Sequence, residues 1–170
     1  MCAKLRVMPS LNTLDARLLL ALVEEPRATV LALAERLGVA RNTVHARLTK
    51  LQERGALASF ARCVDPAALG YPLTAHITAS VTQQRLAEVA TALAEVPEVI
   101  EVHGISGNLD LLIRVVARDA EDLYRIAGAI LATPGIERTT TALVMRNLVD
   151  HRIEPLLRRA LHTDDPGRAG

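Results

Sequence analysis

This sequence of 170 residues lacks tryptophan and has few other aromatic side chains, namely Phe60, Tyr71 and Tyr124. Its two cysteines, Cys2 and Cys63, form neither a disulfide framework nor a metal-ligand spacing, so we interpret them as free thiols in a reducing cytoplasm. No run approaches the roughly 20 apolar residues of a membrane span, and the first ten residues lack the apolar segment of a signal peptide. These absences exclude a disulfide-stapled scaffold and a membrane protein, and they predict a cytoplasmic location.

What the sequence does contain is aliphatic apolar material and an uneven distribution of charge. Hydrophobic residues make up 50% of the chain, enough to bury one medium core or two small ones. Residues 1–65 carry ten basic and six acidic side chains, a net +4, whereas residues 66–170 carry ten basic and thirteen acidic ones, a net −3. The basic first third predicts that a polyanion such as nucleic acid binds the N-terminal part.

Hydrophobic spacing predicts three short helices in this basic part, over residues 14–24, 30–37 and about 40–54. Thr29 is placed to cap the second helix and Gly38 to end it, so that a tight turn joins the last two helices. The third helix carries an apolar stripe made of Val44, Leu48 and Leu51. This arrangement is typical of a helix-turn-helix, whose last helix lies in the major groove of DNA.

The outward face of the third helix contains no acidic residue between Arg41 and Gln52. Arginine can pair with guanine, asparagine with adenine, and threonine or alanine can contact the methyl group of thymine. Arg47, Lys50 and Arg54 are better placed to neutralise phosphates. The predicted DNA-binding residues are Thr29, Arg41, Asn42, Thr43, His45, Ala46, Arg47, Thr49, Lys50 and Arg54. A plain three-helix bundle with a basic solvated face is the alternative interpretation.

The periodicity changes after this part, and the later elements follow a β-α-β-β-α-β order. Strands are predicted at residues 73–82, 100–106, 109–116 and 136–145, and helices at 86–93 and 123–130, with Gly107-Asn108 forming a two-residue hairpin turn. Two similar segments, residues 86–99 and 123–136, each contain a helix, a proline turn and the start of a strand, which supports a ferredoxin-like fold. The predicted organisation is an N-terminal arm (1–13), a helix-turn-helix domain (14–56), an extended linker strand and hinge (57–71), a ferredoxin-like domain (72–150), and a C-terminal helix with a disordered tail (151–170).

The predicted hairpin has the residue types that recognise a free amino acid. Gly104 stands near a strand end, where glycine often marks a bulge or a close approach, and Asp110 stands between Leu109 and Leu111, where an acid is disfavoured. Asp110 could pair with an ammonium group while backbone N–H groups near the glycines hold a carboxylate. A structural hairpin whose aspartate caps local N–H groups explains the residues equally well. The first strand has an uncharged polar face, which predicts that a second subunit covers this face. The face is formed by Thr74, His76, Thr78, Ser80 and Thr82.

Several of these motifs together resemble the Lrp/AsnC (feast/famine) transcriptional regulators. The resemblance covers residues 14–148 and rests on the runs at 14–19, 33–39, 43–48 and 51–55, on Asp65-Pro66 and Leu69-Gly70 at the domain junction, and on the glycine hairpin. It implies an α+β protein, with a winged-helix-like helix-turn-helix domain followed by a ferredoxin-like ligand-sensing (RAM) domain. It also implies a homodimer that assembles into tetramers or octamers, and an amino acid or related effector bound between subunits. The residues that it assigns to the effector are Gly104, Gly107, Asn108 and Asp110, with Thr139 and Thr141 on the last strand. The chain departs from the family at Ala40, where serine is usual, so the third helix lacks its side-chain cap.

Other functions fit the sequence less well. Siroheme decarboxylases resemble the layout, but they carry aromatic, histidine- and arginine-rich strands where this chain is aliphatic. An RRM-type RNA-binding module stacks bases on sheet aromatics, which are missing here. An amino-acid-sensing module without DNA binding remains open. No catalytic order, metal-spaced cluster or phosphate loop is present, so the sequence predicts no enzyme, metal or cofactor, and as partners double-stranded DNA, a second copy of the chain and a small effector.

Overall fold

The computed structural model describes residues 11–163, which form two compact units. Of the described residues, the first unit contains those from 11 to 59 and from 149 to 163, and the second contains Phe60–Leu148. Each unit is described by itself. Most of the predicted N-terminal arm, with Cys2, and the tail from residue 164 lie outside the described residues. Between residues 11 and 163 no helix is both long and apolar enough to cross a membrane.

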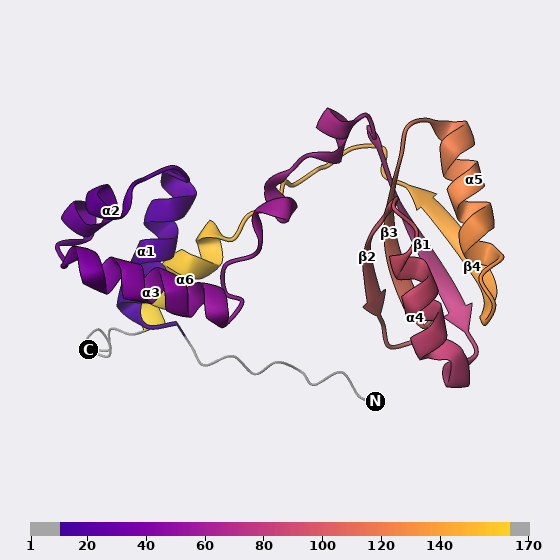
Figure 1. Ribbon diagram of the computed structural model, residues 1–170, viewed down its shortest axis with the longest axis horizontal. Helices are drawn as coiled ribbons and strands as arrows, with labels where there is room; N and C mark the ends of the chain where they lie inside the picture. Colours follow the sequence, from indigo (N-terminus) through magenta and orange to yellow (C-terminus); the bar gives the residue numbers. More distant parts are fainter. Residues whose placement is uncertain (1–10, 164–170) are drawn as a thin grey trace. The chain divides into compact units, whose positions relative to one another are not determined.

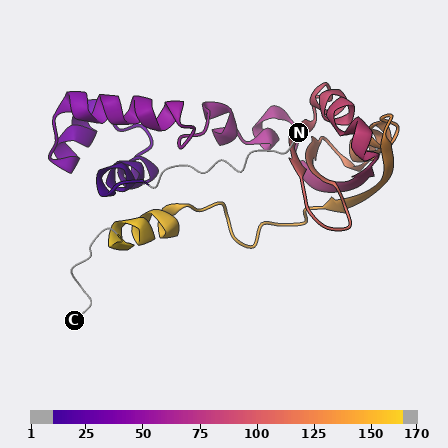
Figure 2. The same ribbon diagram turned by 90° about the horizontal axis from the view of Figure 1, so that it is seen from below.

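The first unit contains the predicted helix-turn-helix, and it begins with α1 (Thr13–Glu24), α2 (Val30–Leu37) and α3 (Arg41–Glu53). The side chain of Asn12 caps α1 by accepting the Asp15 N–H at 2.8 Å, and the Thr29 Oγ1 caps α2 by accepting the Ala32 N–H at 3.2 Å. Gly38 ends α2 in the left-handed conformation, and α3 follows after a short turn (Figure 2). The predictions for Thr29 and Gly38 are therefore confirmed.

A fourth helix, α6 (Glu154–Thr163), belongs to the same unit. Its Leu157 is 4% exposed and lies in one hydrophobic core with Leu18, Leu33 and Leu51 of the first three helices. The chain thus leaves the first unit after α3, forms the second unit, and returns to complete the first core (Figure 1). The sequence pattern predicts the helix but not its place in this core.

The predicted extended linker strand over residues 57–65 is wrong. Two short 3₁₀ turns, η1 (Phe60–Cys63) and η2 (Pro66–Leu69), stand in this connection instead. The Asp65 Oδ1 accepts the Ala67 N–H at 3.0 Å, and Pro66 supplies a backbone angle suited to the start of a helical turn. Because a strand needs a neighbour to pair its N–H and C=O groups, and no described strand lies beside this segment, local turns satisfy the backbone.

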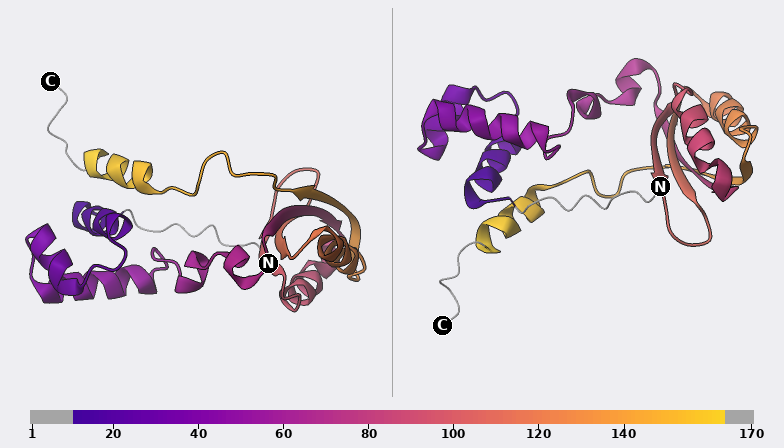
Figure 3. Two further views of the ribbon diagram at one scale, coloured as in Figure 1. Left: turned by 90° about the horizontal axis from the view of Figure 1, so that it is seen from above. Right: turned by 60° about the horizontal axis from the view of Figure 1, so that its bottom comes forward.

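The second unit is the predicted ferredoxin-like βαββαβ domain. Its elements are β1 (Leu73–Val81), η3 (Gln83–Arg85), α4 (Leu86–Ala94), β2 (Val99–Gly104), β3 (Leu111–Ala117), α5 (Ala120–Leu131) and β4 (Ile136–Leu143). The strands pair antiparallel in the order β2-β3-β1-β4. Both helices cover one face of the sheet (Figure 3), where Ile77 and Ile113 of the strands pack against Val89 of α4 and Ile126 of α5. The other face carries the polar row of β1.

Two features fix how the helices of this domain meet the sheet. Asp122, at the start of α5, is 4% exposed and accepts hydrogen bonds from Arg118 and Arg125. These bonds, that of the Arg118 side chain first, hold the pKa of Asp122 far below its usual range, and Asp122 in turn raises the pKa of both arginines. Gly135 precedes β4 with φ 103°, and a Cβ there would lie 2.9 Å from the Val89 Cγ2. Glycine is required at position 135 because the positive φ is strained for other residues and because a Cβ would clash with Val89.

The predicted two-residue hairpin turn at Gly107-Asn108 is also wrong. The loop between β2 and β3 spans residues 105–110, and Asp110 precedes β3 rather than standing within it. The Ile105 N–H donates to the Asp110 C=O at 2.9 Å, but the Asp110 N–H donates to the Ala79 C=O on β1 at 3.0 Å. The loop is wider because Asp110 bonds to β1 as well as across the hairpin.

Candidate DNA interface and effector hairpin

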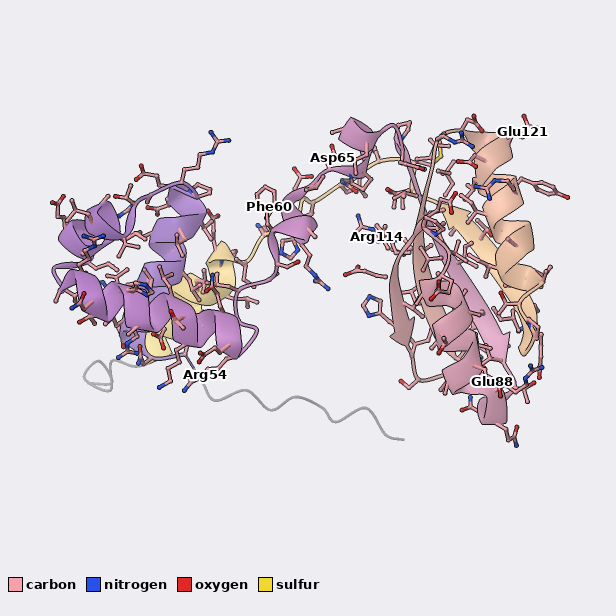
Figure 4. The ribbon with its side chains drawn as sticks, viewed as in Figure 1. Arg54, Phe60, Asp65, Glu88, Arg114 and Glu121 are labelled. Carbon is pink, nitrogen blue, oxygen red and sulfur yellow. The ribbon has the colours of Figure 1, made fainter. Side chains whose placement is uncertain are left out.

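The predicted DNA-binding residues on α3 share a largely exposed helix face. Thr43, Arg47 and Arg54 are half-buried, and the exposed members are Arg41, Asn42, His45, Ala46, Thr49 and Lys50. The opposite stripe faces the core, since Val44 is 1% and Leu51 2% exposed. Arg54 lies at the C-terminal end of α3 (Figure 4). The structure therefore brings these predicted residues together on one helix.

Three local features shape this face. No side chain caps α3 at Ala40, as the sequence predicts, so the N–H groups of its first turn have no side-chain acceptor. The Thr49 Oγ1 donates to the His45 C=O at 3.1 Å, which leaves the threonine methyl group as the free part of that side chain. Thr29 is exposed but immediately precedes α2, where its hydroxyl oxygen caps that helix.

Arg47 differs from the other basic residues of α3, because the structure shows it in an ion pair. Its Nη1 lies 2.9 Å from the Oδ1 of Asp15 in α1, and the Asp15 side chain is 8% exposed. Sequence reasoning missed this role of Asp15. The signal was present, since Asp15 stands three residues before the buried Leu18 and four before Leu19, on the inward face of α1.

At the hairpin of the second unit, Gly104, Gly107 and Asn108 are exposed. A Cβ added at Gly104 or Gly107 would meet no atom within 4 Å, so nothing in this chain approaches these glycines closely. The backbone of Gly107, with φ 125°, accounts for glycine at that position. No such constraint applies to Gly104, which ends β2.

Asp110 connects this hairpin to the end of β1. Its carboxylate accepts the Val81 N–H at 2.9 Å and the Gln83 Nε2 at 2.5 Å. Asp110 therefore caps N–H groups, as the structural interpretation predicts, but these belong to residues at and just after the end of β1 and not to the hairpin itself. Thr139 of β4 pairs with Ala79 of β1, the residue whose C=O binds the Asp110 N–H, so Asp110 and Thr139 flank the same residue. Thr141 lies opposite Ile77, two residues further from the hairpin.

The open face of the sheet carries Thr74, His76, Thr78 and Ser80 of β1, all half-buried in the single chain. The His76 Nδ1 is buried and makes no hydrogen bond. On the edge strand β2, the Glu101 Oε1 lies 2.9 Å from the Arg62 Nη2, and the Glu101 Oε2 lies 3.8 Å from the Arg114 Nη1. Among residues 11–163, no group of three or more His, Cys, Asp and Glu side chains is arranged to hold a metal ion.

Comparison with known proteins agrees with both units. Residues 11–57 match the family described as winged helix-turn-helix DNA-binding, and residues 74–154 match the Lrp/AsnC ligand binding domain. The chain is 32% identical over 136 residues to the HTH-type transcriptional regulator FL11 of Pyrococcus horikoshii, covering 80% of this chain and 90% of that protein.

Solved structures show the same architecture. The structure of AsnC from E. coli superposes with a TM-score of 0.75 at 26% identity, over 86% of this chain and 100% of that one. A Neisseria meningitidis transcriptional regulator in complex with L-Met superposes with a TM-score of 0.72 at 22% identity, over 83% of this chain and 94% of that one. The fold and site define a helix-turn-helix transcriptional regulator with a ligand-binding domain. The chain belongs to the Lrp/AsnC family.

Proposed function

We propose that α3 reads base sequence in the major groove of double-stranded DNA. The observation that supports this most is the exposed face of α3, which carries no acidic residue from Arg41 to Gln52, with Asn42 and Ala46 outward and the apolar stripe inward. In this proposal Asn42 pairs with adenine, and Lys50 and Arg54 neutralise phosphates. The N–H groups at the uncapped start of α3 are further donors for a phosphate oxygen.

The test starts from duplexes that the full chain selects from a random library. Asn42→Ala should change which duplexes bind, with a cost of about 1–3 kcal/mol at one base position. The control variant Lys50→Ala should weaken binding to selected and scrambled duplexes alike. It should also reduce the slope of log affinity against log salt concentration by about one. Identical effects of both variants on every duplex would contradict a base-reading helix.

We further propose that two copies of the chain pair through the open face of the sheet, as a homodimer that assembles into tetramers or octamers. The row Thr74, His76, Thr78 is uncharged, and the unpartnered His76 Nδ1 suits a covered surface. Thr78→Lys should place like charges in that interface and give monomers in sedimentation analysis. Thr91→Lys, on the exposed face of α4, is the matched control and should leave the mass unchanged. A Thr78→Lys oligomer of unaltered mass would move the interface elsewhere.

An amino acid or related small effector is the proposed ligand of the second unit, and the open hairpin at Gly104, Gly107 and Asn108 is its proposed site, with Asp110, Thr139 and Thr141 beside it. The Asp110 carboxylate has about four acceptor positions, and the fold occupies two of them, so it can still accept an ammonium group. The Neisseria meningitidis neighbour in complex with L-Met is consistent with this ligand class.

Thermal unfolding of the full chain with each of the twenty amino acids tests this site, because a ligand raises stability according to its affinity. At least one amino acid should raise the Tm, and Asn108→Ala should reduce that shift without changing the Tm of the free protein. No shift with any of the twenty at millimolar concentration would remove the amino acid as effector. We also propose that the protein acts in the cytoplasm and is no enzyme, in keeping with relatives that are named transcriptional regulators.

A further inference from the structure

One apolar stripe holds α3 to the core of its unit, formed by Val44 and Leu51 with the partly buried Leu48. Val44 is 1% exposed and Leu51 is 2% exposed, and they are seven residues apart, so their side chains point the same way from the helix. The buried stripe decides which side of the helix is turned to the core, and a contact on the flank of the stripe adds a further restraint on small rotations about the helix axis. No side-chain cap at Ala40 adds a further constraint at the start of the helix.

The ion pair between Arg47 and Asp15 acts on the flank of this stripe. Arg47 follows Val44 by three residues and precedes Leu51 by four, which places it beside the stripe rather than opposite to it. Its guanidinium reaches the Asp15 carboxylate of α1 at 2.9 Å, where the Asp15 side chain is 8% exposed. Breaking this ion pair would leave a buried carboxylate without a partner, which is strongly destabilising, so we expect the contact to persist when the protein binds DNA.

We propose that Arg47 is a positioning residue. Through its ion pair with Asp15 it sets the rotation of α3, and so decides which bases Asn42 and Ala46 meet, instead of neutralising a phosphate itself. The inference rests on the proposed role of α3 in the major groove. It assigns to Asp15, an acidic residue within a DNA-binding domain, a part in sequence discrimination.

The two possible roles of Arg47 predict opposite results for Asp15→Asn. If Arg47 is a phosphate contact that Asp15 partly neutralises, removing the acid frees the arginine and removes a negative charge, so binding to all DNA tightens. If the pair positions α3, binding to the selected duplex weakens while binding to other DNA changes little. A merely structural role would lower the Tm without changing the preference between duplexes.

The experiment measures the affinity of the full chain for a duplex selected by the unchanged protein and for a scrambled duplex of the same composition, at several salt concentrations. The variants are Asp15→Asn, Arg47→Met and the double variant, and Lys50→Met serves as the matched loss of an exposed cation of α3. Asp15→Asn and Arg47→Met should each lower the ratio of selected to scrambled binding about tenfold. The double variant should lower it no further, because both single changes break one interaction.

The salt dependence separates the roles of the two cations. Arg47→Met should leave the slope of log affinity against log salt unchanged, whereas Lys50→Met should reduce it by about one and weaken both duplexes equally. A loss of about one in the slope with Arg47→Met, or an unchanged ratio with Asp15→Asn, would overturn the proposal. If a single variant fails to fold, the double variant decides, because it leaves no buried charge unpaired and should still have lost discrimination. Failure of the unchanged protein to select any sequence would instead refute the base-reading function.

Discussion

In the helix-turn-helix unit most polar side chains of α3 are exposed, Asn42 and Lys50 among them, whereas Asp110 and Asp122 of the sheet unit are bound by other groups of the fold. Asp122 is bound by two arginines, and Asp110 accepts the N–H of Val81. An exposed helix face with no acid over about three turns, as from Arg41 to Gln52, indicates a surface that meets another molecule. A buried or paired acid at a strand or helix end indicates a local structural task, and any binding role must be shared with it.

The largest expected effect comes from α6, which follows the sheet unit in the sequence and completes the helix-turn-helix core. Leu157→Ala should lower the free energy of unfolding of that unit by about 2–5 kcal/mol, because Leu157 is 4% exposed. Leu156→Ala, at a neighbouring side chain that is 61% exposed, should change it by less than about 0.5 kcal/mol. Denaturant unfolding measures both, and equal losses would mean that α6 does not pack as described.

The next test compares two glycines of the sheet unit. Gly135→Ala should lower the free energy of unfolding by about 2–3 kcal/mol, because its φ of 103° is strained for alanine and the added Cβ would clash with Val89. Gly104→Ala has open space and no positive φ, so it should be nearly neutral for stability. A comparable loss at Gly104 would show that an unrecognised contact approaches the hairpin.

Asp110 sharpens the contrast within the hairpin itself. Asp110→Ala should destabilise the sheet unit by about 1–3 kcal/mol, because the Val81 N–H loses its acceptor. Asn108→Ala, in the same loop but exposed, should leave stability unchanged and affect only an effector-dependent Tm shift. If Asp110→Ala unfolds no more easily than the unchanged protein, the carboxylate is free for ligand binding alone.

Acid should reveal the paired carboxylate at the start of α5. The arginines lower the pKa of Asp122, so the unfolded chain binds a proton before the folded one does as the pH falls. The resulting stability is complete above the ordinary aspartate pKa of about 3.9 and is lost progressively below it. Asp122→Asn should therefore lower the Tm at pH 7 and flatten its fall below pH 4. A parallel acid limb for both proteins would assign the acid sensitivity to other carboxylates.

The sequence predicts those features that depend on residues close together along the chain. Helical spacing indicates α1 to α3 and the outward face of α3, and Thr29 and Gly38 mark the limits of α2. The β-α-β-β-α-β order along the chain follows from the change between strand and helix periodicity. The predicted strand over residues 57–65 is wrong because the sequence pattern cannot show whether another strand lies beside this segment to pair with it.

The features that the sequence misses depend on distant residues. Gly107-Asn108 is the right composition for a two-residue turn, but Asp110 bonds to Val81, 29 residues earlier, and the loop is longer. The partner of Arg47 is 32 residues away on α1, so the arginine reads as a phosphate contact by its helix face alone. Leu157 joins a core formed by residues more than a hundred positions earlier, which no local period reveals.

The central claim is that this protein binds DNA through the exposed cations and polar side chains of α3, and the salt dependence of binding tests it most directly. If Arg41, Lys50 and Arg54 of two subunits contact phosphates, affinity for the selected duplex should fall about a thousandfold between roughly 50 and 200 mM salt. Lys50→Met should make that fall less steep. An affinity that stays constant over this range would contradict the account.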